Sequence, residues 1–180
     1  GAAGYTGSIL CEHLLNAGYQ VTGLDNLMYG QTSLMHLCAS PNFSFEQGDS
    51  RDESLMSRLV SSADVIIPLA AIVGAPACNN DPSMAESVNV GAIRLVEQLR
   101  SPGQLVVYPN TNSGYGAGVG EDVCTEETPL NPISLYGRTK VSVVPDIQPY
   151  RTHGAGTSPV PVPVPVPVHT TLTRPPFPHR

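Results

Sequence analysis

The fold class is decided by residues 1–25, GAAGYTGSILCEHLLNAGYQVTGLD. Three glycines recur there as G-x-x-G-x-x-G and open a segment, 5–17, whose apolar residues lie at helical spacing. Gly18 is expected to end that helix, and 19–24 has the character of a short strand. A glycine loop, a helix and a strand in this order predict the start of a parallel α/β sheet.

The same alternation continues along the chain. Helices are predicted over 53–60 and 82–99, and strands over 43–47, 63–71 and 104–108. Strands separated by helices indicate a doubly wound parallel sheet with helices on both faces. Because the chain begins at the first glycine of the loop, we expect this sheet to lack its first strand.

The glycine loop has the composition of a phosphate-binding turn. Glycines permit a tight turn and let the backbone approach a pyrophosphate, while the start of the following helix offers free N–H groups to an anion. An ordinary turn is the alternative for this loop. The choice between the two interpretations therefore depends on the residues that follow it.

Asp25 favours the phosphate-binding interpretation because it ends the strand 19–24. It follows Gly4 by 21 residues, the spacing at which a carboxylate accepts hydrogen bonds from the ribose hydroxyls of an adenosine. A carboxylate there repels a 2′-phosphate, so NAD is favoured over NADP. A turn or capping aspartate is the alternative. Asp49, after the next strand, is placed either to meet the adenine amino group or to cap a turn or helix.

Tyr136 and Lys140 form a Y-x-x-x-K pattern, which puts both side chains on one face of a helix. A neighbouring ammonium favours the phenolate and lowers the pKa of a tyrosine, which can then exchange a proton with a substrate hydroxyl. Upstream, the strand 104–108 runs into a polar loop, where an open α/β sheet places its chemistry. Thr111 in this loop is placed to hydrogen-bond the same hydroxyl. A plain helix surface and a capped loop are the alternatives.

Bulk composition disfavours several classes of protein. Of the 180 residues 41% are hydrophobic and only 13% are charged, with a net charge of −6. A basic face for nucleic acid is not expected, and no apolar run approaches the roughly 20 residues that span a membrane. The five histidines lack ligand spacing, so no metal site is expected, and the four scattered cysteines fit reduced thiols of a cytoplasmic protein.

Composition changes after Lys140. Residues 141–180 contain 10 of the 18 prolines, and proline alternates with valine over 159–167. Every second residue there lacks an N–H, so a central strand is excluded and a disordered or polyproline II tail is expected. The sequence thus predicts a globular part, 1–140, and a Pro-rich tail, 141–180.

Seven motifs occur in order: GAAGYTG, GLDN, GD, PLAAIVG, ESVNVGA, VVYPNTNSGYG and YGRTK. Together they resemble the extended short-chain dehydrogenase/reductase family of NAD-dependent sugar-nucleotide epimerases and dehydratases, over residues 1–140. The resemblance implies a Rossmann-like fold, NAD as cofactor and a nucleotide sugar as substrate. The implied catalytic residues are Thr111, Tyr136 and Lys140. The implied cofactor-binding residues are Gly1, Gly4, Tyr5, Thr6 and Gly7 at the pyrophosphate, Asp25 and Asn26 at the adenosine ribose, Asp49 at the adenine, Leu69, Ala70 and Ala71 along the cofactor path, Asn89 in support and Lys140 at the nicotinamide ribose.

The mechanism that this resemblance implies is a reversible oxidation of a sugar. Tyr136 removes the proton from a ring hydroxyl while hydride passes to the nicotinamide. The family's 4,6-dehydratases carry Asp-Glu directly after the threonine, where this chain has Asn112 and Ser113. This departure favours an epimerase or a simple dehydrogenase. Pro68 stands where many relatives have histidine.

The resemblance further implies a strand before Gly1 and a sugar-nucleotide domain after Lys140. We therefore expect residues 1–180 to be a fragment that is inactive alone; a homodimer is compatible with the resemblance. Two other functions stay open, namely a nucleotide-binding protein without turnover and an interaction module. In the latter, P-x-x-P at 175–178 would meet an aromatic-lined groove. Non-native sequence is the preferred interpretation of the tail.

Overall fold

A computed structural model describes residues 1–117, 124–125 and 128–147. From residue 148 onward the predicted Pro-rich tail lies outside the described residues. The α-helices are α1 (Tyr5–Asn16), α2 (Glu53–Ser61), α3 (Ala75–Asn80), α4 (Pro82–Glu86), α5 (Ala92–Leu99) and α6 (Leu135–Ser142). The strands are β1 (Val21–Asp25), β2 (Phe43–Gln47), β3 (Val65–Ile66) and β4 (Leu105–Val106). The shorter helical turns are η1 (Met35–Ala39), η2 (Ser87–Gly91), η3 (Asn112–Gly114) and η4 (Val144–Asp146).

The strands form two parallel pairs, which agrees with the predicted α/β class. β1 pairs with β2 along its whole length, whereas β3 and β4 share only two residue pairs. Within the described residues no strand joins these pairs, so the predicted doubly wound sheet is present as two separate halves. The strands predicted over 63–71 and 104–108 are shorter than predicted, since β3 and β4 pair over only two residues each.

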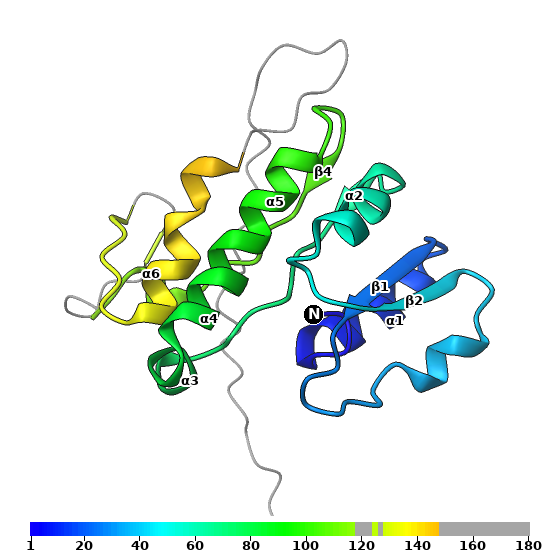
Figure 1. Ribbon diagram of the computed structural model, residues 1–180, viewed down its shortest axis with the longest axis horizontal. Helices are drawn as coiled ribbons and strands as arrows, with labels where there is room; N and C mark the ends of the chain where they lie inside the picture. Colours follow the sequence, from blue (N-terminus) through cyan, green and yellow to red (C-terminus); the bar gives the residue numbers. More distant parts are fainter. Residues whose placement is uncertain (118–123, 126–127, 148–180) are drawn as a thin grey trace, which may run out of the picture.

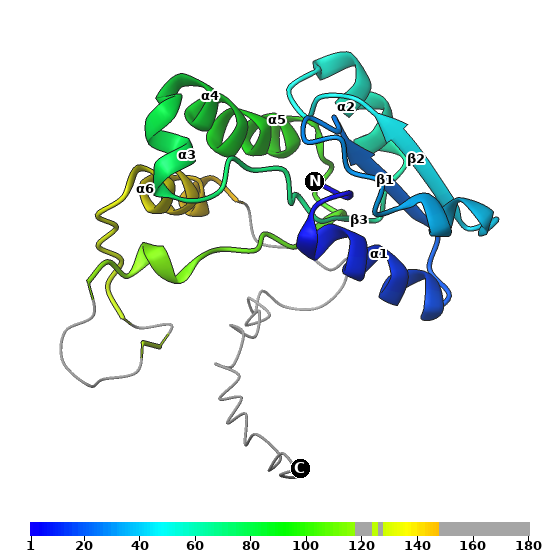
Figure 2. The same cartoon turned by 90° about the horizontal axis from the view of Figure 1, so that it is seen from below.

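Helices cover both faces of the strands (Figures 1 and 2). The face under α1 is filled by a cluster centred on Ala3, Cys11, Leu34, Leu37 and Phe43. The opposite face, under α2 and α5, is filled by Met56, Val60 and Val96, against which Leu24, Ile66 and Val106 pack. Because this second cluster takes residues from β1, β3 and β4, it holds the two strand pairs together without a shared hydrogen-bond ladder.

Helix α1 begins and ends as its glycines predict. Gly18 adopts a left-handed φ of +87°, and its N–H donates to the Leu15 carbonyl at 3.0 Å while the Tyr19 N–H donates to Leu14 at 3.1 Å. This pair of bonds is a Schellman motif, which satisfies the last carbonyls of the helix. It fixes the direction in which the chain enters β1.

The long helix predicted over 82–99 is one helical run with a π turn in it. Asp81 caps α4 through the Met84 N–H at 2.9 Å, and η2 has π geometry between α4 and α5. The turn carries Asn89, which is only 1% exposed. A π turn of this kind is frequent at functional sites. The preceding helix α3, after Gly74 with φ +86°, was not predicted.

Helix α6 presents the Y-x-x-x-K pattern. Its first turn is capped by Ser134, whose Oγ accepts the Gly137 N–H at 3.0 Å. The helix ends at Ser142 and is followed by η4, which contains Pro145; a proline lacks the N–H that continuing the helix would need. Among the described residues no helix is long and apolar enough to cross a membrane.

Candidate functional site

A cavity of about 640 Å³ lies where the glycine loop, the ends of β1 and β2, the segment after β3 and helix α6 meet. Its volume falls within the range of small-molecule sites, roughly 300–1,000 Å³. All the predicted site residues except Asn89 and Thr111 line it: Gly1, Gly4, Tyr5, Thr6, Gly7, Asp25, Asn26, Asp49, Leu69, Ala70, Ala71, Tyr136 and Lys140. Residues far apart in the sequence thus meet around one space.

The glycine loop is packed so closely that side chains are excluded from it. A Cβ on Gly1 would overlap the backbone of Leu69 and Ala70, and a Cβ on Gly7 would overlap the carbonyl of Gly1. Helix α1 starts after Gly4 without a side-chain cap, and its first turn contains no acidic residue. The loop and helix start therefore offer backbone N–H groups and a positive dipole end to an anion in the cavity.

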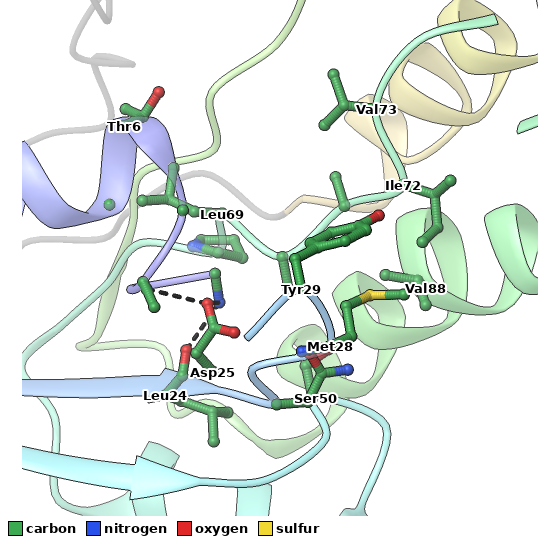
Figure 3. Close-up of a pocket in the computed structure, with 18 of the residues that line it drawn as sticks. Thr6, Leu24, Asp25, Met28, Tyr29, Ser50, Leu69, Ile72, Val73 and Val88 are labelled. Atoms are coloured by element: carbon green, nitrogen blue, oxygen red, sulfur yellow. Dashed lines mark hydrogen bonds and ion pairs between the residues drawn. The ribbon is translucent and has the colours of Figure 1, made fainter. Parts of the chain in front are cut away.

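Asp25 is held rigidly beside this loop and is 6% exposed. Its Oδ2 accepts the Ala3 N–H at 3.0 Å and its Oδ1 accepts the Leu27 N–H at 2.8 Å. Figure 3 shows the carboxylate directed toward the glycine loop. Oδ2 also lies 3.4 Å from the N-terminal ammonium of Gly1, so Oδ1, which accepts one hydrogen bond, has a lone pair left for a ligand.

Asp49 has a partner that the sequence did not predict. The guanidinium of Arg51 donates through Nε to Asp49 Oδ1 at 2.9 Å and through Nη2 to Oδ2, and the Arg51 N–H also donates to Oδ1. These hydrogen bonds lower the pKa of the Asp49 carboxyl. Arg51 also donates to Ser87 Oγ at 3.3 Å, so it connects this edge of the cavity to η2.

The proton chemistry differs from the sequence prediction at one point. Burial raises the pKa of Tyr136; its hydrogen bond with Thr111 acts in the opposite direction, and nearby Cys78 raises the pKa further. The predicted lowering by Lys140 is wrong, because the Lys140 ammonium lies over the Tyr108 ring, with Nζ 3.9 Å from the ring centroid. Burial lowers the pKa of Lys140 to about 8.

Asn89 and Thr111 lie just behind the cavity surface. Asn89 Oδ1 accepts the Ile72 N–H at 2.8 Å, and its Nδ2 donates to the Ile72 carbonyl and to Thr139 Oγ1, both at 3.1 Å. Thr111 caps η3 by accepting the Ser113 N–H at 3.2 Å, in addition to its contact with Tyr136. Both residues therefore support groups that line the cavity.

Exposed apolar side chains at the cavity were missed by the sequence analysis. Tyr29 is 70% exposed and Val73 is 64% exposed, and both line the cavity together with Met28. Figure 3 shows the Tyr29 ring extending from the loop after Asp25 toward Val73. The run Leu-Met-Tyr directly after a carboxylate at a strand end was the available signal.

Fold and cavity together define a Rossmann-like α/β protein with a ligand-sized cavity at its glycine loop. The chain belongs to the NAD dependent epimerase/dehydratase family, whose family model matches residues 1–164. Members of this family are enzymes that use NAD.

Relatives and solved structures agree with this assignment. The chain is 36% identical over 146 residues to a UDP-glucose 4-epimerase of Mycolicibacterium smegmatis, covering 79% of this chain and 47% of the relative. Its fold resembles DesIV, a dTDP-glucose 4,6-dehydratase of Streptomyces venezuelae with NAD bound (TM-score 0.71, 29% identity, 78% and 46% of the two chains). It also resembles a UDP-glucuronic acid 4-epimerase of Bacillus cereus in complex with UDP-glucuronic acid and NAD (TM-score 0.69, 28% identity, 78% and 47%). The chain thus spans about half the length of these proteins.

Proposed function

We propose that the protein binds NAD in this cavity and catalyses the epimerisation of a nucleotide sugar, with Thr111, Tyr136 and Lys140 as catalytic residues. The observation that carries the proposal is that one cavity joins the glycine loop and Asp25 to Tyr136 and Lys140. Relatives named as UDP-glucose and UDP-glucuronic acid 4-epimerases support the same reaction class.

The residues around the cavity fit the parts of a dinucleotide in sequence. The loop residues Gly1, Gly4, Tyr5, Thr6 and Gly7 would hold the pyrophosphate, since side chains are excluded there and α1 presents its N-terminus. Asp25 and Asn26 would accept the ribose hydroxyls, and Asp49, paired with Arg51, would meet the adenine. Leu69, Ala70 and Ala71 line the path toward Lys140, and Asn89 holds the segment that follows them.

Bound NAD would accept a hydride from the sugar and return it. Tyr136 takes the proton of the sugar hydroxyl and later gives it back, while Thr111 fixes the direction of the phenol through their hydrogen bond. Burial raises the pKa of Tyr136, which favours the neutral phenol, and Lys140, one helical turn away, would bind the nicotinamide ribose beside it. Asn112 and Ser113 offer no carboxylate for water elimination, which favours epimerisation over dehydration.

The cofactor part of the proposal is tested by isothermal titration calorimetry of the 180-residue chain with NAD and with NADP. Binding of NAD with weaker or absent binding of NADP is expected, because Asp25 opposes a 2′-phosphate. Binding of NADP equal to or tighter than that of NAD would contradict the role given to Asp25. Calorimetry tests binding separately from turnover.

The catalytic part is tested by Tyr136→Phe, which keeps the ring and removes the ionisable hydroxyl. In a protein that joins this chain to a family-type second half, NAD affinity should be retained while turnover of UDP-glucose falls by about 10²- to 10⁴-fold, the usual effect of losing a general acid–base. Tyr19→Phe is the matched control, since Tyr19 is 62% exposed and lies away from the cavity lining. Equal turnover by the two variants would remove Tyr136 from the mechanism.

A further inference from the structure

Tyr108 contacts Lys140 at both ends of the lysine residue. The ammonium Nζ lies 3.9 Å from the centroid of the Tyr108 ring, and the Tyr108 hydroxyl donates to the Lys140 backbone carbonyl at 3.3 Å. Tyr108 comes from the segment directly after β4 and is separated from Lys140 by 32 positions. It does not line the cavity, whereas Lys140 does, so the tyrosine contacts the lysine from behind.

The ring contact matters because Lys140 is buried without a carboxylate. Lys140 is 7% exposed. None of the ion pairs in the described part of the chain includes it. A buried ammonium without an anionic partner is costly. The face of an aromatic ring attracts a cation electrostatically, and the attraction is strongest where water is excluded.

The Tyr108 ring is itself held in place by packing. Tyr108 packs in a cluster with Val90, Ile93 and Val143, of which Val143 is completely buried. This cluster connects η2, α5 and the end of α6. A ring fixed by three helical segments can hold a flexible side chain in one direction, which a solvated lysine would not keep.

We propose that Tyr108 is a positioning residue that holds the Lys140 ammonium by its ring face and the Lys140 backbone by its hydroxyl, so that the amine is directed into the cavity. The functional consequence rests on the proposed function, in which Lys140 binds the nicotinamide ribose. The structural relationship can be tested without it.

Lys140 is the only lysine among the 180 residues, which makes a direct measurement possible. A chain labelled with [13C]lysine gives one Hε–Cε cross-peak in a proton–carbon correlation spectrum. In the wild type the ring current of Tyr108 should shift the Hε resonance upfield of its position in the urea-unfolded chain. Tyr108→Phe should keep this shift because it keeps the ring, and Tyr108→Leu should abolish it. Tyr19→Leu, at an exposed tyrosine, should leave it unchanged.

The consequence for binding is measured by calorimetry with NAD and with ADP on the same variants. Tyr108→Leu should weaken NAD binding about tenfold, because the released lysine side chain would have to be ordered again when the ligand binds. ADP binding should stay within about twofold of wild type, because ADP would reach only the glycine loop and Asp25. Tyr108→Phe should bind NAD nearly as wild type does.

The two proposals fail separately. The proposed contact of Lys140 with the Tyr108 ring is contradicted if the Hε resonance of the folded wild type lies at its unfolded position. It is also contradicted if the upfield shift survives in Tyr108→Leu. Equal weakening of NAD and ADP by Tyr108→Leu also overturns its positioning role. If Tyr108→Leu does not fold, the wild-type and Tyr108→Phe spectra decide. Absence of NAD binding in the wild type contradicts the proposed function while leaving the spectroscopic test in place.

Discussion

The side-chain amide of Asn89 holds both backbone groups of Ile72, accepting its N–H at 2.8 Å and donating to its carbonyl at 3.1 Å. The same amide nitrogen donates to Thr139 Oγ1 at 3.1 Å, directly beside Lys140 in the chain. One buried side chain therefore fixes the cavity segment after β3 relative to helix α6.

Replacing Asn89 by alanine should destabilise the fold by about 2–3 kcal/mol, because the Ile72 N–H is left buried and unpaired. Urea denaturation followed by circular dichroism measures this change. Asn79→Ala is the control, since Asn79 lies exposed on α3 and should change stability by less than about 0.5 kcal/mol. Similar losses for both variants would show that the Asn89 bridge adds little.

Gly7 and Gly91 should respond in opposite directions to alanine. A Cβ on Gly7 would overlap the carbonyls of Gly1 and Ala2, so Gly7→Ala should cost about 1–3 kcal/mol and weaken phosphate-ligand binding. A Cβ on Gly91 meets nothing within 4 Å, and its helical backbone should gain up to about 1 kcal/mol. Thermal melting with ADP titration measures both effects; a stabilised Gly7→Ala protein would refute the packing argument.

The buried ammonium of Lys140 should make stability depend on pH. Its pKa is about 8 in the folded chain against an ordinary value of 10.5, so the unfolded chain binds more protons between these values. The stability cost is therefore complete below pH 8 and is relieved as the pH rises toward 10.5. Lys140→Met keeps the chain length without the charge, and its stability advantage over wild type should shrink between pH 7 and pH 9.5 in urea titrations. A stability difference that does not change with pH would show that the Lys140 ammonium is solvated in the folded chain.

The cap of α6 should affect the site as well as the helix. Ser134→Ala removes the bond to the Gly137 N–H and should cost about 1 kcal/mol, the usual value of an N-cap serine. Ser57→Ala, at an exposed position within α2, should be neutral within about 0.5 kcal/mol. In the [13C]lysine-labelled chain, Ser134→Ala should also broaden the Lys140 cross-peak, whereas Ser57→Ala should not. An unchanged cross-peak would show that the Ser134 cap does not affect the Lys140 side chain.

Local spacing was sufficient to predict the elements that depend on neighbouring residues. Helix α1 ends one residue before its predicted limit because Gly18 acts through bonds within its own turn. The glycine loop and Asp25 were predicted to lie at one site because they belong to one short helix–strand segment, and both line one cavity. Periodicity and turn chemistry carry such information directly.

Contacts between distant segments could not be predicted in this way. The sequence places Lys140 beside Tyr136 on one helical face. In the structure the Lys140 ammonium instead contacts the ring of Tyr108, 32 positions away. Arg51 pairs with Asp49 and also reaches Ser87, which no local pattern indicates. The choice among several nearby partners depends on how the helices pack, and burial then changes the pKa values that spacing alone suggested.

The π turn η2 sets a rotational phase between two halves of one helix. Upstream, Ala85 of α4 faces the cluster shared with α3 and α6, and downstream Val96 of α5 faces the cluster shared with α2 and the strands. Deleting a single residue within Ser87–Gly91 would turn α5 by about 100° relative to α4. One of the two apolar faces would then point to solvent, so this segment should tolerate substitutions at its exposed positions far better than any change in its length.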